Sequence, residues 1–237
     1  DLGLLITLIG VIAIVPDGLL VRLINTESWT LSVWRGLLIG ISMTIFLAFY
    51  YRGDFFSKFY EMGWLGVIVS ITTGFSTFLF VYALSNTSVA SALFIVSTSP
   101  AFSALFAWLL LKEHVPARTW ITVAVVLVGI GIIAWGSSGA GSNTAGNLAA
   151  LAIAVILATN FSLIRYFDGA DMVPAVAVGG FLSAVYAFPF ADSLALSAEQ
   201  WWYTILLASI LLPIAFSLMY VGPRYIPAAE VSLLLLL

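Results

Sequence analysis

The chain has 237 residues, of which 62% are hydrophobic and 8% are charged, and its formal net charge at pH 7 is -3. Soluble domains are about 45–50% apolar and about 25% charged, so this composition excludes an ordinary soluble protein. The few charges form no basic patch, which argues against a nucleic-acid partner. Because the chain has no cysteine, thiolate metal sites are also excluded.

The apolar residues are divided into runs of about 20 residues, the length that a helix needs to cross a bilayer core of about 30 Å. The sequence therefore predicts an all-α fold, a polytopic transmembrane helical bundle. In chain order, the expected spans are residues 2–21, 29–50, 62–84, 88–111, 117–135, 146–166, 174–191 and 200–221, and a ninth apolar run begins at Ala228. The first run leads into another span rather than a cleavage site, so we expect no signal peptide.

Small residues and a proline indicate how the third and fourth spans pack. Gly66, Ser70 and Gly74 recur at four-residue spacing, which leaves one stripe of the third span smooth enough for another helix to approach closely. Pro100 lies in the middle of the fourth span and cannot donate to the carbonyl of Val96. A neighbouring helix, a hydroxyl or water must then meet that carbonyl.

The polar connections predict the orientation of the bundle. Residues 51–61 are expected to form a loop, and the Gly/Ser-rich residues 136–143 are the most flexible connection in the chain. With a cytoplasmic amino terminus, the cytoplasmic connections carry six of the eight lysines and arginines, and the other side carries Arg22 and Arg35. The positive-inside rule expects this split. We therefore predict a multi-pass protein of the inner (plasma) membrane.

The two halves of the chain contain a weak internal repeat. Aligning Arg22 with Arg165, a shift of 143 residues, sets IVPDGLLVR beside LATNFSLIR. The first repeat, residues 1–137, contains five expected spans, and the second, residues 146–237, contains three and the start of a fourth. Because an odd number of spans puts equivalent connections on opposite faces, the repeats are predicted to be inverted. A substrate site is then expected between them, near the bilayer midplane.

The sequence resembles the EamA-like branch of the drug/metabolite transporter superfamily. The resemblance rests on YALSNTSVASALF at 82–94, SPAFSALFAWLLLKE at 99–113, VLVGIGIIAWG at 126–136 and the partial second copy RYIPAAEVSLL at 224–234. It implies two inverted five-helix repeats and export of amino acids or other small metabolites. Of the ten spans that the resemblance implies, about eight and a half are present, so we expect the sequence to be truncated at its carboxyl end.

Asp17 is the first candidate site residue. A carboxylate inside a span costs about 2.5–3.5 kcal/mol on insertion scales and normally faces a cavity or a partner, although an interfacial position is an equal alternative. Arg35 lies at a similar depth in the next span. The two could form a structural ion bridge or a clamp for a substrate carboxylate.

Three further residues are candidates for the substrate site. Asn160 is equivalent to Asp17 under the repeat and would lie toward the opposite mouth, or it could be a packing hydrogen bond. Trp34 and Tyr82 could line an amphipathic cavity, or they could be interfacial anchors, as aromatic residues near span ends often are. The candidate substrate site is thus Asp17, Arg35, Trp34, Tyr82 and Asn160.

The function predicted from these features is secondary transport, most simply export of small metabolites by alternating access between the repeats. The partners would be a small-molecule substrate, the lipid bilayer and a candidate coupling proton, and no cofactor is implied. An enzyme is disfavoured because the only histidine, His114, is expected on the opposite face from Ser137 and Ser138. The alternatives are another substrate class, such as nucleotide sugars, or a membrane scaffold or channel subunit without transport.

Overall fold

The computed structural model describes residues 2–110, 144–166 and 171–221, Tyr225 and the short stretches 120–121, 124–125, 128–129 and 131–132. Throughout this described part every regular element is helical. The helices before residue 111 are α1 (Leu2–Ile14), α2 (Asp17–Ile24), α3 (Ser28–Tyr51), η1 (Arg52–Asp54), α4 (Phe55–Glu61), α5 (Gly63–Asn86), α6 (Val89–Val96) and α7 (Ser99–Leu110). Those after residue 143 are α9 (Thr144–Tyr166), α10 (Val173–Ala187), η2 (Phe188–Phe190), α11 (Ala198–Ile205), η3 (Leu206–Leu211) and α12 (Leu212–Val221).

Seven stretches of the described residues are long and apolar enough to cross a membrane. They are Gly3–Ile24, Ser28–Glu61, Gly63–Asn86, Val89–Phe106, Thr144–Arg165, Val173–Phe190 and Ala198–Val221. The prediction of a polytopic helical bundle is therefore confirmed. Most of the expected span 117–135, all of the glycine-rich residues 136–143 and the run from Ala228 lie outside the described residues.

Two of the predicted spans are broken rather than continuous, and each break lies beside a proline. α1 ends at Ile14 and α2 begins at Asp17, directly after Pro16. α6 ends at Val96 and α7 begins at Ser99, directly before Pro100. Proline has no N–H to donate and its ring clashes with the carbonyl four residues earlier, so it interrupts a helix. The first break makes Asp17 the opening residue of α2.

Residues 51–61 are helical, so the prediction of a loop there was wrong. α3 continues to Tyr51 and is followed by η1 and α4. Phe55 and Phe59 pack against the core, whereas Phe56 and Tyr60 are more than four-fifths exposed. This short helix therefore has an anchored face and an exposed aromatic face, an arrangement typical of a membrane–water interface.

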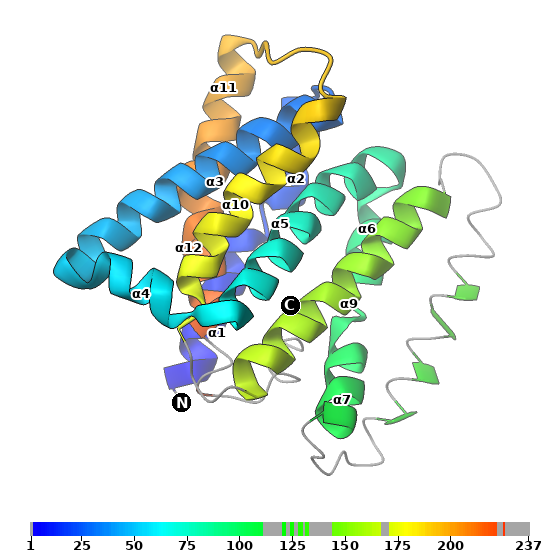
Figure 1. Ribbon diagram of the computed structural model, residues 1–237. Coiled ribbons are helices and arrows are strands. Elements are labelled where there is room, and N and C mark those ends of the chain that lie inside the picture. Colours follow the sequence, from blue (N-terminus) through cyan, green and yellow to red (C-terminus); the bar gives the residue numbers. More distant parts are fainter. Residues whose placement is uncertain are drawn as a thin grey trace.

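α10 lies between α3 and α5 (Figure 1) and packs closely against both. Glycines make this close packing possible. A methyl group built on Gly36 of α3 would lie 2.6 Å from the carbonyl oxygen of Gly180, and one on Gly74 of α5 would lie 2.7 Å from that of Gly179. Carbon atoms do not approach oxygens so closely. The smooth stripe predicted on the third span is thus used at Gly74, where α10 crosses it.

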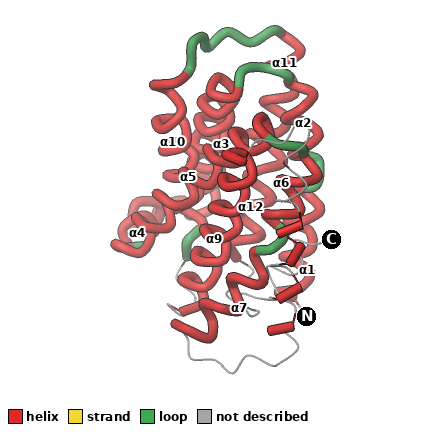
Figure 2. Tube along the Cα trace, turned by 90° about the vertical axis from the view of Figure 1, so that its right-hand side faces the viewer, coloured by secondary structure: helices red, strands yellow, loops and turns green. Residues whose placement is uncertain are grey.

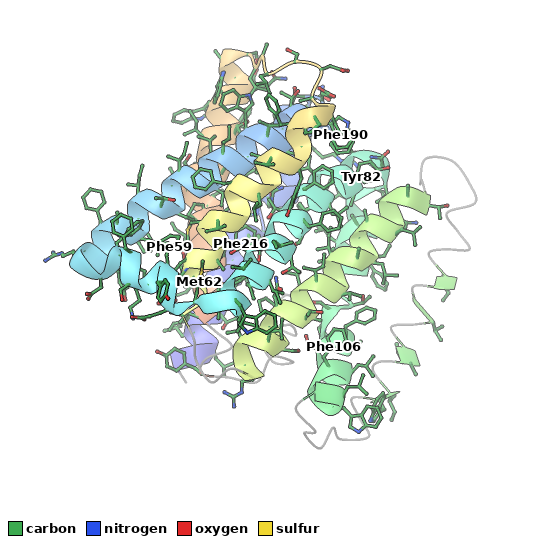
Figure 3. All side chains as sticks on the ribbon, viewed as in Figure 1. Phe59, Met62, Tyr82, Phe106, Phe190 and Phe216 are labelled. Atoms are coloured by element: carbon green, nitrogen blue, oxygen red, sulfur yellow. The ribbon has the colours of Figure 1, made fainter. Side chains whose placement is uncertain are left out.

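The connections between spans lie at two ends of the bundle (Figure 2). At one end, Thr30 donates to the carbonyl of Ser193 at 2.5 Å, and Gln200 Nε2 donates to that of Ile24 at 2.9 Å. Tyr82 and Phe190 lie at this end, while Phe59 and Met62 lie at the other (Figure 3). The connection between α2 and α3 and the connection between η2 and α11 therefore lie at the same end of the bundle, as the predicted topology requires.

Candidate functional site

Asp17 and Arg35 form an ion pair inside the bundle. Arg35 Nη2 lies 2.7 Å from Asp17 Oδ2, and the two side chains are only 2% and 3% exposed. Asp17 is the first residue of α2, directly after the break at Pro16, and its carboxylate meets the guanidinium of Arg35 from α3. A single charge buried in a span would be costly, so each side chain depends on the other for its placement.

The pair retains polar atoms that could bind a ligand. Asp17 Oδ1, Arg35 Nε and Arg35 Nη1 are buried and have no hydrogen-bond partner among the described residues. The guanidinium also lies over the ring of Phe80, with its carbon 5.0 Å from the ring centre, a distance at which cation–π attraction is effective. Buried polar groups are normally satisfied. An acceptor and two donors without partners therefore mark a position for a polar ligand or water.

Asp17 and Arg35 line a cavity of about 430 Å³, within the range of small-molecule sites, about 300–1,000 Å³. α1, α2, α3, α5, α6, α9 and α12 contribute to the wall. Ser76, Thr77 and Ser97 add hydroxyl groups, and most of the other lining residues are apolar. Phe216, labelled in Figure 3, comes from α12. An apolar chamber with one concentrated polar wall can hold and orient a small polar molecule.

Trp34 and Tyr82 do not line this cavity. Trp34 Nε1 donates to the carbonyl of Leu194 at 2.9 Å, and its ring meets that of Trp201 edge-on. Tyr82 stacks on Trp29 with ring centres 5.5 Å apart. Both side chains lie near the end of the bundle where α2 meets α11, so their geometry favours the anchor interpretation.

Asn160 lies outside the cavity lining, in a separate buried hydrogen-bond network. Its Nδ2 donates to Thr73 Oγ1 and to the hydroxyl of Tyr220, both at 3.2 Å, and its Oδ1 accepts from Thr72 at 2.7 Å. Thr73 and Tyr220 are themselves 2.5 Å apart. The network ties α9 to α5 and α12. The structure therefore brings together Asp17 and Arg35 of the five candidates, and gives Asn160 a packing contact.

Several residues of the site escaped the sequence analysis. Ser76, Thr77 and Phe80 line the cavity from α5, and Thr73 belongs to the Asn160 network. The signal that could have found them is the polar run from Thr72 to Thr77 inside an otherwise apolar span. Serine and threonine are common in such spans because their hydroxyls bond to the preceding turn, so the run alone is a weak indication.

Seven apolar helices long enough to cross a membrane, with a mainly apolar cavity that carries Asp17 and Arg35 on its wall, define a polytopic membrane protein with room for a small molecule. The chain belongs to the EamA-like transporter family, whose family model matches residues 1–135. It is therefore a transporter of the drug/metabolite type, and the resemblance seen in the sequence is confirmed.

Six solved protein chains are also similar in structure. One, titled only "Crystal structure of protein", has a TM-score of 0.74 and 20% sequence identity, and the match covers 98% of this chain and 82% of that one. At this identity the likeness shows the fold alone. No curated protein matches the chain significantly.

Proposed function

We propose that the protein is a secondary transporter that exports small zwitterionic metabolites such as amino acids. The observation that carries this proposal is the buried Asp17–Arg35 pair on the cavity wall, with one acceptor and two donors unused. In this proposal Asp17 Oδ1 accepts from a substrate ammonium, and Arg35 Nε and Nη1 donate to a substrate carboxylate. The hydroxyl groups of Ser76 and Thr77 offer further polar contacts.

The charge of the cavity favours this substrate class over nucleotide sugars. Asp17 and Arg35 are the only charged residues among the described residues that line it, so its net formal charge is zero. A nucleotide sugar carries phosphate charges that would meet a single arginine already paired with a carboxylate. Burying such charges without partners is unfavourable, whereas a zwitterion adds one charge of each sign.

Alternating access between two inverted repeats, residues 1–137 and 146–237, is the mechanism that we propose. Figure 1 supports it, because α1 and α9 run in opposite directions, as do α3 and α10. Under the repeat, α1 corresponds to α9, α3 to α10, and α5 to η3 and α12. The contact of α5 with α9 then corresponds to that of α12 with α1, and the contact of α5 with α10 corresponds to that of α12 and η3 with α3. Inverted repeats let one rocking motion close one mouth and open the other.

Coupling to a proton is the accompanying proposal for the energy source. Protonation of Asp17 would remove the charge that balances Arg35 and would free the guanidinium for a substrate carboxylate. Proton entry and substrate binding would then be linked through the same two side chains. We choose Asp17 as the group that binds the coupling proton because it is the carboxylate among the described residues that line the cavity.

The test is transport by the purified full-length protein in liposomes. We expect counterflow of radiolabelled amino acids, competition by excess unlabelled amino acid, and no effect of a nucleotide sugar. Liposomes without protein provide the background. Uptake of the nucleotide sugar in place of the amino acids would reject the substrate class, and an absence of counterflow for a broad amino-acid panel would reject the proposal.

A further inference from the structure

A second, more open groove lies beside the ion-pair cavity, between α2 and α6. Its volume is about 530 Å³, and Leu19, Arg22 and Ser88 belong to its wall. Val15, Gly18 and Leu93 line both this groove and the ion-pair cavity. The two spaces are therefore separated by the same few side chains.

Gly18 lines both spaces and faces α6 across the groove. A methyl group built on it would lie 3.3 Å from Val89 Cγ1 and 3.8 Å from Leu93 Cδ1. Both atoms are ends of side chains on α6, and neither belongs to the backbone. A larger side chain at position 18 would fill the space between the helices, while small movements of Val89 and Leu93 would widen it.

α6 forms the side of this groove opposite α2. It packs mainly on α9, and it has only eight residues. Its last residue, Val96, precedes the break at Ser97 and Thr98, which separates α6 from α7. Hinges of helical segments are commonly such short interruptions at element ends.

Arg22 lies at the far end of the groove, in the last turn of α2. Its side chain is exposed, and Nη2 donates to the carbonyl of Thr87 at 3.3 Å. A cation at the mouth of an apolar passage raises the local concentration of carboxylates. The groove therefore leads from Arg22 at its mouth, past Gly18, to the buried pair at Arg35.

We propose that the groove between α2 and α6 is the passage by which a carboxylate-bearing substrate moves between the ion-pair cavity and the Arg22 end, with Gly18 setting its width. This inference rests on the proposed transport function. Gly18 is thus a residue that limits substrate size.

The test measures access and transport separately. The 237 residues contain no cysteine, so a single cysteine introduced among them is compared with the same protein without it, which gives the background. Thr77→Cys reports from inside the cavity and Leu23→Cys, which is half-exposed on α2, reports from outside it. Each is placed in the full-length protein in lipid nanodiscs and treated with a small anionic methanethiosulfonate reagent.

We expect Gly18→Leu to slow modification of Thr77→Cys at least about tenfold, with Leu23→Cys changing less than about twofold. Gly18→Ala should give an intermediate rate, and Val89→Ala should give a faster one. Should Gly18→Leu fail to fold, the last two variants decide. Equal rates at Thr77→Cys in all the folded variants would overturn the passage.

Transport by the same variants distinguishes this inference from the proposed function. Slowed modification in Gly18→Leu, together with no transport of any amino acid by the protein that keeps glycine at position 18, would support the passage and reject the substrate proposal. Unchanged amino-acid transport in Gly18→Leu would reject the passage and leave the transport function in place.

Discussion

Asp17 is buried beside the guanidinium of Arg35 on a cavity wall. Its charge balances Arg35 and, in the proposed function, takes part in transport, and a mutation can test the second role. Asp17→Asn keeps the size of the side chain and the helix start but leaves Arg35 without a counter-charge. We expect the variant to insert into the membrane and to lose at least about tenfold in transport rate, equivalent to about 1.4 kcal/mol. The measurement is initial amino-acid counterflow, with membrane levels of the protein compared in parallel.

The exposed pair Lys58–Glu61, with its 2.6 Å contact, provides the matched control. Glu61→Gln also removes one carboxylate charge from an ion pair, but away from the cavity, and should transport at the normal rate because exposed pairs contribute little. Normal transport by Asp17→Asn between about pH 6 and 8, where an ordinary aspartate is ionised, would contradict a role for this charge.

Asn160 should matter for stability, because its amide links three helices. Asn160→Leu removes the two donations to Thr73 and Tyr220, while the Thr72 hydroxyl can still donate to the carbonyl of Ile68. We expect a loss of about 1–3 kcal/mol in unfolding free energy. Tyr220→Phe should lose less, since Thr73 and Asn160 can still bond. Thermal unfolding in detergent measures both. An unchanged melting temperature for Asn160→Leu would show that the network adds no net stability.

The contact of Asp17 with Arg35 could be predicted from the sequence. The two residues carry opposite charges at similar depth in adjacent spans, and an unpaired charge inside a span is costly. It could not select Ser76 and Thr77, because a hydroxyl can bond to its own helix on any face and so carries no direction. Trp34 and Tyr82 show the same limit for aromatic residues. An aromatic side chain near a span end suits both an interface and a cavity, and only the packing of α11 and Trp29 distinguishes them.

The break between α6 and α7 yields a prediction for one element. Pro100→Ala would restore a backbone N–H that can bond to Val96 and let the helix run through Ser97 and Thr98. We expect a stiffer span, with slower turnover and an equal or higher melting temperature. Transport rate and thermal unfolding are measured on the same preparation. Faster transport after this change would show that the break is no part of the moving wall.

Spans were predictable as elements because bilayer thickness fixes their length, and the seven found within the described residues match the predicted runs to within a few residues, apart from the extension beyond Tyr50. The breaks were less predictable, since proline is often tolerated in membrane helices. α4 was missed because its helicity depends on Phe55 and Phe59 finding the core, which is a tertiary contact. A short segment of mixed polarity carries too little periodicity to reveal that contact.

At the scale of the whole molecule, the two ends of the bundle can be assigned to the two sides of the membrane. Asp192 lies in the connection before α11, and Lys58 lies in α4, at the opposite end. With the amino terminus in the cytoplasm, Asp192→Cys should react with an impermeant maleimide added to intact cells, as should cysteines at positions 137–145. Lys58→Cys should react only after permeabilisation. The reverse pattern would reject the proposed orientation.

The place of α10 between α3 and α5 has a consequence for biosynthesis. A chain emerges from the ribosome amino-terminal end first, so α3 and α5 enter the membrane before their partner exists. Their glycine faces at Gly36 and Gly74 must wait for Gly179 and Gly180. We expect a chain stopped before Val173 to be digested much faster by added protease than the 237-residue chain. Equal resistance would mean that another segment shields those faces during synthesis.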